Sequence, residues 1–290
     1  MDYLLNLLVF VAVFTVLASS LDLLAGQTGL LSLAHAAFYG LGAYTSALLA
    51  TQAGASFFIG VLAGMIIAAL ISFLISLPSL RLHDDYFAIA TFGFQVIVLS
   101  VLNNWMGLTG GPLGISGIPH PMILGWHVSS QLDFCILAAA FGGFAYSVVY
   151  LLASSPLGRV LHAIREDEVF ARALGKNTLY FKITAFAVSA ALAAIAGSLY
   201  AHYITYIDPT SFTVMDSILI ISMVIIGGAG SFWGPFVGAF VLVTLPEALR
   251  FIGLPSASAA NLRQIIYGTL LVVMIMFRPR GLMGKYSFAK

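Results

Sequence analysis

Charged residues are scarce in this 290-residue chain, in which Asp, Glu, Lys and Arg make up 8% of the positions. A soluble domain carries about a quarter. Hydrophobic residues make up 61%, so the chain lacks the polar side chains to cover a water-exposed surface, and a soluble fold is excluded. Because the net charge is only +1, neither a nucleic acid nor an acidic partner is indicated. We expect an all-α, polytopic integral membrane protein with about eight to ten transmembrane helices, for which the lipid bilayer is the main solvent.

Several groups that carry catalysis are missing too. The single cysteine, Cys135, cannot form a disulfide within the chain. The sequence contains no H-E-x-x-H zinc motif and no G-x-S-x-G serine elbow, so neither an enzyme nor a metal site is predicted. It also has no G-x-x-x-x-G-K-[ST] phosphate loop, so the chain is not expected to bind ATP by that route. If transport is active, its energy must come from a partner or from an ion gradient.

Long apolar runs are what the chain does contain. Nine of them approach the roughly 20 residues that cross a bilayer. These expected spans lie near residues 3–21, 29–50, 57–79, 86–102, 131–153, 180–203, 213–227, 234–251 and 261–277. Together they predict a single transmembrane domain over residues 1–290.

Basic residues gather in two places and predict how the spans are oriented. Residues 154–182 hold five of the 12 Lys and Arg residues, and four more follow the last span. The positive-inside rule places both segments in the cytoplasm. The loop 103–130 has no Lys or Arg and is expected to face outward, as is the N-terminus. The four basic residues of the C-terminal tail are Arg278, Arg280, Lys285 and Lys290.

Two glycine-rich stretches interrupt the apolar runs and predict discontinuous helices near residues 22–34 and 226–235. Backbone groups freed there must be satisfied by protein or by a wet cavity. Paired breaks of this kind often mark an inverted repeat with a pathway at its interface. Close helix packing through small residues is the alternative for each glycine, and a packed, hydrogen-bonded residue is the alternative for the lone His. The candidate pathway residues are Gln27, Gly29, Ser32, His35, Gly228 and Gly230.

The charged segment 154–182 has the pattern of an amphipathic helix. Apolar side chains recur at helical spacing over residues 159–174. Ser155-Pro156 is a plausible helix start and Gly175 a plausible stop. A docking helix for a cytoplasmic partner and an ordinary solvated loop both fit this pattern.

The outward loop 103–130 is rich in Asn, Gly and Pro, which predicts a shaped and largely neutral lip. Either a gate or docking surface, or a plain connection, fits such a loop. Its candidate functional residues are Asn103, Asn104, Thr109, Gly110 and Gly111.

Several of these segments together resemble the permease subunits of branched-chain amino acid ABC importers, with the M-type permease as the closer match. The resemblance covers most of the chain in the family's order. Its departures include Gln95, where many members carry Glu. The segments are GQTGLLSLAHAAFYGLGAYTSALL (26–49), DYFAIATFGF (85–94), NNWMGLTGGPLGISGIP (103–119), GRVLHAIREDEVFARALGKN (158–177), MVIIGGAGSFWGPFVGAF (223–240) and FRPRGLMG (277–284).

The resemblance implies a bacterial inner-membrane permease that pairs with an H-type permease and has no cofactor of its own. Two cytoplasmic ATPases would bind ATP and Mg²⁺ and drive the pair, and a periplasmic binding protein would deliver the ligand. Residues 154–182 would then be a coupling segment. The residues expected to couple the ATPases are Arg159, Arg165, Glu166, Asp167, Glu168, Arg172 and Gly175.

Two alternatives stay open. Permeases for urea and for other neutral or aromatic amino acids share the same framework. A stand-alone secondary transporter or channel for a small neutral solute also fits the composition, although it has no evident use for a docking helix.

Overall fold

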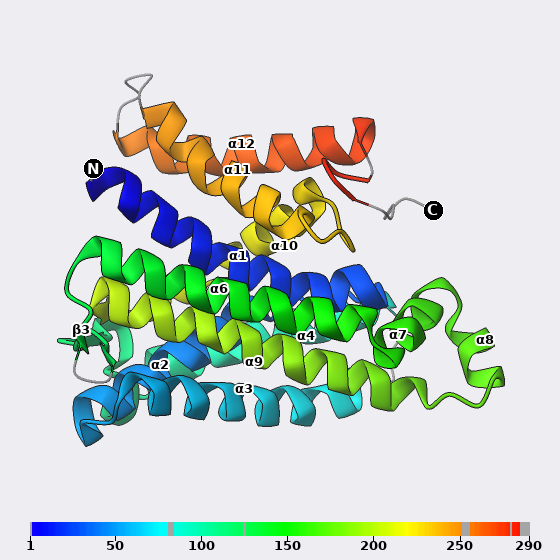
Figure 1. Ribbon diagram of the computed structural model, residues 1–290, viewed down its shortest axis with the longest axis horizontal. Coiled ribbons are helices and arrows are strands. Elements are labelled where there is room, and N and C mark those ends of the chain that lie inside the picture. Colours follow the sequence, from blue (N-terminus) through cyan, green and yellow to red (C-terminus); the bar gives the residue numbers. More distant parts are fainter. Residues whose placement is uncertain (1, 81–83, 124–125, 251–255, 279, 285–290) are drawn as a thin grey trace.

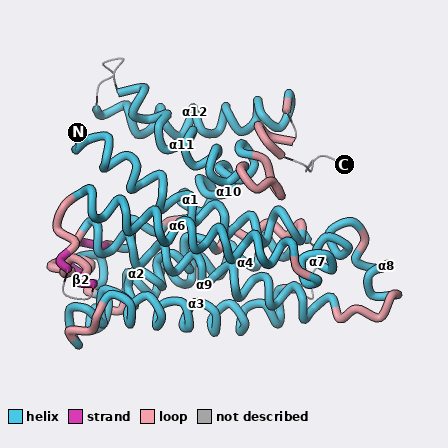
Figure 2. The backbone as a smooth tube through the Cα atoms, in the orientation of Figure 1, coloured by secondary structure: helices cyan, strands magenta, loops and turns pink. Residues whose placement is uncertain are grey.

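The computed structural model describes residues 2–80, 84–123, 126–250, 256–278 and 280–284. The chain forms a bundle whose long helices lie side by side along one axis (Figure 1), and nearly all of its backbone is helical (Figure 2). Each of the nine expected spans overlaps a helix, although the one expected over 29–50 begins in an extended segment, and the all-α prediction is confirmed. These helices are α1 (Asp2–Thr28), α2 (His35–Ala53), α3 (Phe57–Ser79), α4 (Asp84–Asn104), α6 (Gln131–Ser154), α9 (Thr178–Ile204), α10 (Val214–Gly227), α11 (Gly234–Arg250) and α12 (Ser256–Phe277).

The outer helices have the apolar surfaces of membrane spans. Within the described residues, five helices are long and apolar enough to cross a bilayer, namely α1, α3, α4, α6 and α9. On α3, large apolar side chains that recur at helical spacing are exposed on the surface of the bundle, as lipid contact requires. They are Leu62, Ile66, Leu70 and Leu74. Shorter apolar stretches lie in α10, α11 and α12.

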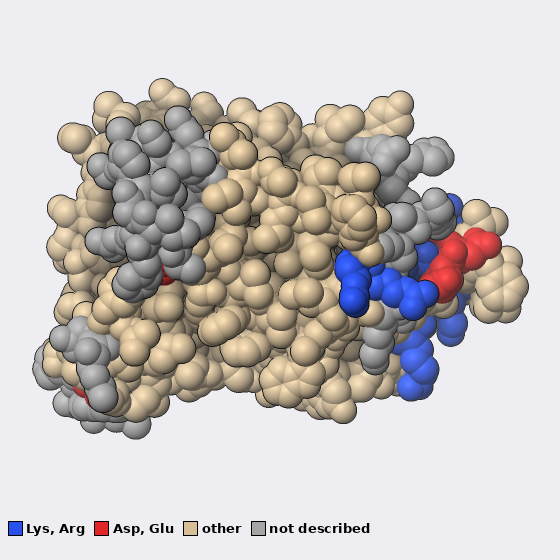
Figure 3. Space-filling model, turned by 90° about the horizontal axis from the view of Figure 1, so that it is seen from above, with Lys and Arg blue, Asp and Glu red and all other residues tan. Residues whose placement is uncertain are grey.

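The two ends of the bundle differ in chemistry. One end carries α5 (Met106–Thr109), the 3-10 helices η1 (Gly111–Leu113) and η2 (Pro209–Phe212), and two short antiparallel pairings. These join β1 (Ile115–Ser116) to β4 (Tyr206–Ile207), and β2 (Met122–Ile123) to β3 (Trp126–His127). The opposite end carries α7 (Pro156–Glu166) and α8 (Glu168–Ala173), and Lys and Arg gather there on the face seen in Figure 3.

The tail after α12 returns to the charged end of the bundle. The Leu282 and Met283 amides donate to the Ile226 and Gly227 carbonyls at the end of α10, at 2.9 Å each. Residues 154–182 and the start of the tail therefore share one end, as the orientation prediction requires. That this end is cytoplasmic stays a prediction. Lys285 and Lys290 of the tail lie outside the described residues.

The first predicted break is present, as an extended segment over residues 29–34 between α1 and α2. The first residue of α2, His35, contacts Ser20 of α1, and α1 continues for eight residues beyond Ser20. At about 1.5 Å per helical residue, the chain therefore doubles back by about 12 Å to start α2 inside the bundle. The Leu33 amide is satisfied there by the Thr91 hydroxyl at 3.0 Å.

A second segment, residues 205–213, also turns back into the bundle, but it does so from the opposite end. It follows the end of α9 and returns into the bundle, where Phe212 packs against Gly40 and against the Tyr39 ring. Helix α10 starts there, and its Ser217 hydroxyl accepts a hydrogen bond of 3.0 Å from the Ala36 amide. Two helices, α2 and α10, thus begin next to each other in the interior and run toward opposite ends.

This geometry changes one detail of the predicted repeat. The helix interruption near 226–235 exists, because α10 ends at Gly227 and α11 begins at Gly234. However, the structural counterpart of the 29–34 break is the segment 205–213, so pairing 22–34 with 226–235 was wrong. The physical reason is that glycines at 226–235 form the tight turn between α10 and α11, whereas the second return into the bundle is made by a Pro-containing 3-10 helix.

Helix α2 is enclosed by its neighbours and packs on α9 backbone to backbone. A Cβ added at Gly42 would lie 2.2 Å from the Ala194 carbonyl oxygen, and one at Gly197 would lie 1.9 Å from the Tyr39 oxygen. Small residues allow this approach, which is the usual way in which helices pack in membranes.

We expect Gly197→Ala to destabilise the fold, because its single added carbon forces α2 and α9 apart. An overpacked core costs about 1–3 kcal/mol, which lowers the melting temperature by several degrees, on the order of 5 °C. Gly93→Ala on α4 is the matched control, since nothing lies within 4 Å of its added carbon. Thermal stability in detergent, followed by size-exclusion chromatography, checks this, and equal melting of the two variants would contradict it.

Candidate functional site

The charged segment forms two helices rather than one. Ser155 caps α7 by accepting from the Gly158 amide, and Pro156 follows at the first helical position, so the predicted start is confirmed. The predicted stop is confirmed by Gly175, whose φ of 76° lies in the left-handed region. A single helix over 159–174 was wrong. Asp167 is extended, with φ −155°, and its carboxylate accepts from the Phe170 amide, so it ends α7 and caps α8.

Glu168 ties α8 to α9 through Lys182, and its second partner, Arg172, lies one turn later on α8 itself. Its carboxylate bonds Arg172 at 2.7 Å and Lys182, at the start of α9, at 2.6 Å. Burial by itself would raise the pKa of Glu168, but hydrogen bonds from Arg172, Lys182 and Thr178 outweigh burial and lower the pKa from 4.5 to about 2. Because its native-state pKa is lowered, Glu168 contributes to stability as the carboxylate.

We expect α8 to loosen in acid. The contribution of Glu168 is complete above pH 4.5 and is lost as the pH falls through about 2. A spin label at exposed Val169 should therefore gain mobility between pH 4.5 and 2, as seen by electron paramagnetic resonance. Glu168→Gln should be mobile at neutral pH and show no titration, whereas Glu166→Gln, at an exposed position on α7, should behave as wild type. A label that is equally immobile throughout in Glu168→Gln would refute this role.

The segment buries one apolar set and exposes another. Leu161, Ile164 and Ala171 face the protein and are buried. Val169, Phe170 and Leu174 are 76%, 60% and 62% exposed at the tip of the segment. Large apolar side chains exposed on a charged surface segment are typical of a surface that docks a partner.

Arg165 links the charged segment to the first helix break. Its guanidinium donates to the Gly26 carbonyl, near the C-terminal end of α1. Gly29, with φ 78°, lies directly beyond that end, and a Cβ there would lie 3.3 Å from Arg165 Cγ. Arg165 therefore contacts both the end of α1 and the start of the 29–34 segment. The remaining coupling candidates, Arg159 and Glu166, are exposed on α7.

Two of the predicted pathway residues line a common polar cavity of about 220 Å³ at the charged end of the bundle. Gln27 contributes from α1, and Gly230 from the turn before α11. Asp22, which was not among the predicted site residues, completes the cavity, and its carboxylate accepts a hydrogen bond of 2.7 Å from the Gly230 amide. Gln27 Oε1 is buried and finds no hydrogen-bond partner among the described residues. The signal that marks Asp22 is a lone carboxylate in an apolar span.

The other pathway candidates lie elsewhere. His35 is fully buried, with its Nε2 atom 3.0 Å from the Ser20 hydroxyl and 3.4 Å from that of Ser189. Ser32 is buried in the break and accepts from the Ala34 amide. Gly228, with φ 107°, packs against the backbone of Gly284 in the tail. These three positions support packing at the breaks rather than line the polar cavity.

Gln95 of α4 ties the two interior helix starts together. Its Oε1 atom accepts from the Ala37 amide at 2.6 Å, and its Nε2 atom donates to the Phe212 carbonyl at 2.8 Å. The Ser217 hydroxyl lies 3.4 Å from the same Oε1 atom. One fully buried side chain therefore satisfies backbone groups of α2 and of the segment before α10. The sequence marked Gln95 only as a difference from the family pattern.

The candidate residues of the outward loop make hydrogen bonds and turns within the loop and with the end of α4. The side-chain amides of Asn103 and Asn104 donate through Nδ2 to the backbone carbonyls of Leu99 and Ser100, one turn earlier on α4. The Thr109 hydroxyl donates to the Leu102 carbonyl at 2.7 Å. Gly110 and Gly111 both have positive φ, at 75° and 56°, and turn the chain into η1. Within the described residues, no cluster of three or more His, Cys, Asp or Glu side chains could hold a metal ion.

These observations define a multi-pass, all-helical membrane protein with two interior helix starts and a charged two-helix segment at one end. The model of the family described as "Branched-chain amino acid transport system / permease component" matches residues 3–275. The chain belongs to this family.

Individual relatives agree with that assignment. The chain is 34% identical to the high-affinity branched-chain amino acid transport system permease protein LivM of Escherichia coli K12, over 93% of this chain and 68% of that protein. It is 35% identical to the protein of the same name from Salmonella typhimurium LT2, with the same coverage. The autoinducer 2 import system permease protein LsrC of E. coli is 26% identical, over 78% of this chain and 62% of that protein. No solved structure matches.

Proposed function

We propose that the chain is the membrane-spanning permease subunit of an ABC importer that passes branched-chain or related neutral amino acids across the inner membrane of a bacterium. The observation that carries the proposal is the segment made of α7 and α8. It presents Val169, Phe170 and Leu174 to water, while Arg165 connects it to α1. The names of the LivM relatives support the cargo class.

The mechanism follows from how the segment is attached. Partner ATPases bind the exposed tip of α8, and the closure of these ATPases on ATP moves α8 together with α7, which directly precedes it, and with the start of α9, to which Glu168 ties α8 through Lys182. The movement reaches α1 and the 29–34 segment through Arg165. Spans that meet at interior helix starts then rock between inward-open and outward-open arrangements.

The proposal extends to the remaining partners and to the orientation in the membrane. The α7 and α8 end and the C-terminal tail face the cytoplasm, and the loop 103–130 faces the periplasm, where a substrate-binding protein delivers the cargo. A second permease completes the pathway, and ATP and Mg²⁺ bind to the partner ATPases. This chain itself is the conduit and carries no catalytic residue.

A stand-alone carrier or channel is the competing function. A different cargo is a second alternative, since one relative is named as a permease for autoinducer 2 and not for an amino acid. Reconstitution separates these. We expect proteoliposomes that hold this chain alone to show no uptake of radiolabelled leucine, isoleucine, valine or urea. Co-reconstitution with the second permease, the ATPases and the binding protein should give uptake that requires ATP. Flux through the chain alone would overturn the proposal.

A further inference from the structure

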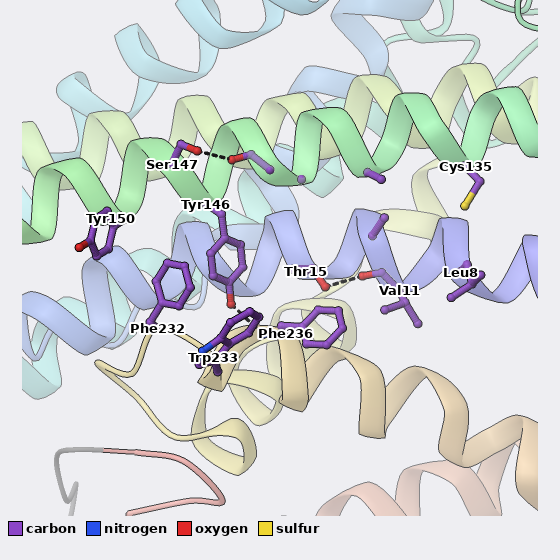
Figure 4. A pocket seen from close by; sticks show the side chains of 14 residues that line it. Leu8, Val11, Thr15, Cys135, Tyr146, Ser147, Tyr150, Phe232, Trp233 and Phe236 are labelled. Atoms are coloured by element: carbon purple, nitrogen blue, oxygen red, sulfur yellow. Dashed lines mark hydrogen bonds between the residues drawn. The ribbon is translucent and has the colours of Figure 1, made fainter.

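The turn over residues 228–233, which joins α10 to α11, is held by side chains of two other helices. The Gly230 amide donates to the Asp22 carboxylate of α1 at 2.7 Å. The Phe236 amide, in the first turn of α11, donates to the Tyr146 hydroxyl at 3.2 Å, and Figure 4 shows the Tyr146 ring pointing from α6 toward the start of α11. The turn is therefore fixed to α1 on one side and to α6 on the other.

The contact between Asp22 and Gly230 is packed tightly against the end of α1. Asp22 is buried, with an exposed fraction of 3%, and Gly26 lies one turn later on the same helix. A Cβ added at Gly26 would lie 2.2 Å from Asp22 Oδ1 and 2.6 Å from the Gly230 nitrogen. Only glycine at position 26 leaves room for this hydrogen bond.

Arg165 of α7 brings a positive charge to the same place. Its guanidinium donates to the Gly26 carbonyl, and its charge acts on the Asp22 carboxylate. A carboxylate that is buried in an apolar bundle is costly unless a cation lies near it. Arg165 is therefore the charge partner of Asp22, and one carboxylate joins α7, α1 and the turn 228–233.

We propose that Asp22 is a positioning residue that transmits the movement of α7 to the second half of the bundle as well as to the first. Through the Gly26 carbonyl, Arg165 acts on the end of α1, after which the 29–34 segment leads into α2. Through Asp22, it acts on the turn 228–233, which directly follows α10. The two helices that start in the interior, α2 and α10, therefore move together when α7 is displaced. This inference rests on the proposed function, in which partner ATPases move α7.

Hydrogen exchange tests the junction without any partner protein. The full chain is reconstituted in nanodiscs, and exchange of the amides of residues 228–233 is followed by mass spectrometry. Asp22→Asn keeps an oxygen that accepts from Gly230 but removes the charge. We expect it to speed exchange about fivefold, because a hydrogen bond to a charged acceptor is roughly twice as strong as a neutral one. Arg165→Gln, a change on α7, should have an effect of the same size on this turn.

Double variants separate one shared junction from independent contacts. Asp22→Asn combined with Arg165→Gln should exchange no faster than the faster single variant, because the two residues act through one contact. Tyr146→Phe removes the other contact of the turn, and its effect should instead multiply that of Arg165→Gln. Lys176→Gln is the matched control, since it removes an exposed cation from the same end of the bundle, and it should exchange as wild type does.

The assembled importer supplies a readout that a purely structural role would not change. Asp22→Asn should transport about fivefold less leucine per ATP hydrolysed while ATP hydrolysis stays as in wild type, whereas a poorly folded variant would lose both. Three results would overturn the proposal: unchanged exchange in either single variant, effects that multiply in the Asp22 and Arg165 double variant, or a wild-type ratio of leucine to ATP in Asp22→Asn. Flux through the chain alone would instead overturn the proposed function, so the two failures are distinguishable.

Discussion

Replacing Phe170 and Leu174 by serine should reduce capture of the partner ATPases by at least tenfold while the permease remains folded. Both side chains are more than half exposed, at 60% and 62%, so their removal leaves no cavity in the bundle. Apolar anchors at the centre of an interface account for about 2 kcal/mol or more each when they are removed, which exceeds a tenfold loss for the pair. Co-purification of the tagged variant with the ATPases, quantified against wild type, measures this.

Two variants give that experiment its control. Leu113→Ser removes an apolar side chain that is 81% exposed at the opposite end of the bundle, and it should leave ATPase capture unchanged. Arg165→Ala with Glu166→Ala should keep the ATPases bound but uncouple ATP hydrolysis from uptake, because the docking tip survives while the link to Gly26 is lost. If the variant with both Phe170 and Leu174 replaced captured the ATPases as well as the wild type does, the tip of α8 would not be part of the interface.

Replacing Gln95 by leucine should lower uptake more than tenfold. Leucine has a similar size but leaves the Ala37 amide and the Phe212 carbonyl without their side-chain partner. A buried backbone group that loses its partner costs about 1–3 kcal/mol, and here both groups lie where α2 and α10 begin. The first turn of α2 and the segment before α10 should therefore no longer be held at a fixed position relative to each other. Uptake by the reconstituted importer, normalised to folded protein, is the measurement.

Gln95→Glu separates the two halves of this contact. A carboxylate still accepts from the Ala37 amide, but it cannot donate to the Phe212 carbonyl unless it is protonated. We expect intermediate uptake that improves as the pH falls. Gln52→Leu, at an exposed position of α2, is the matched control and should transport as wild type. Full uptake by Gln95→Leu would show that the amide is dispensable.

The sequence predicted the helices well because each feature it used was local. Apolar runs located nine helices, five of which are long and apolar enough to cross a membrane among the described residues. Ser155-Pro156 and Gly175 marked the limits of the charged segment, and glycines marked the interruptions beside α1 and α11. The break inside the charged segment was missed. At Asp167 the backbone leaves the helical conformation, and the carboxylate accepts a hydrogen bond from the Phe170 amide. The apolar periodicity of the sequence continues across this position and so does not show the break.

The candidate site was harder to predict because it depends on contacts between distant segments. Asp22 meets Gly230 across 208 residues, and Gln95 meets Phe212 across 117. No local pattern determines such partners. The second return of the chain, at 205–213, had a weak signal: α10 has 14 residues, or about 21 Å, which is short for a core about 30 Å thick. That shortness is what an interior helix start requires.

The central claim is that α7 and α8 dock cytoplasmic ATPases, and its most direct test is the composition of the native complex. The tagged chain would be captured from its own membrane in mild detergent and its partners identified by mass spectrometry. We predict two ATPases with phosphate-binding loops and a second permease, and loss of the ATPases alone when Phe170 and Leu174 are serine. Recovery of this chain by itself from intact membranes would contradict the importer and favour a self-sufficient carrier or channel.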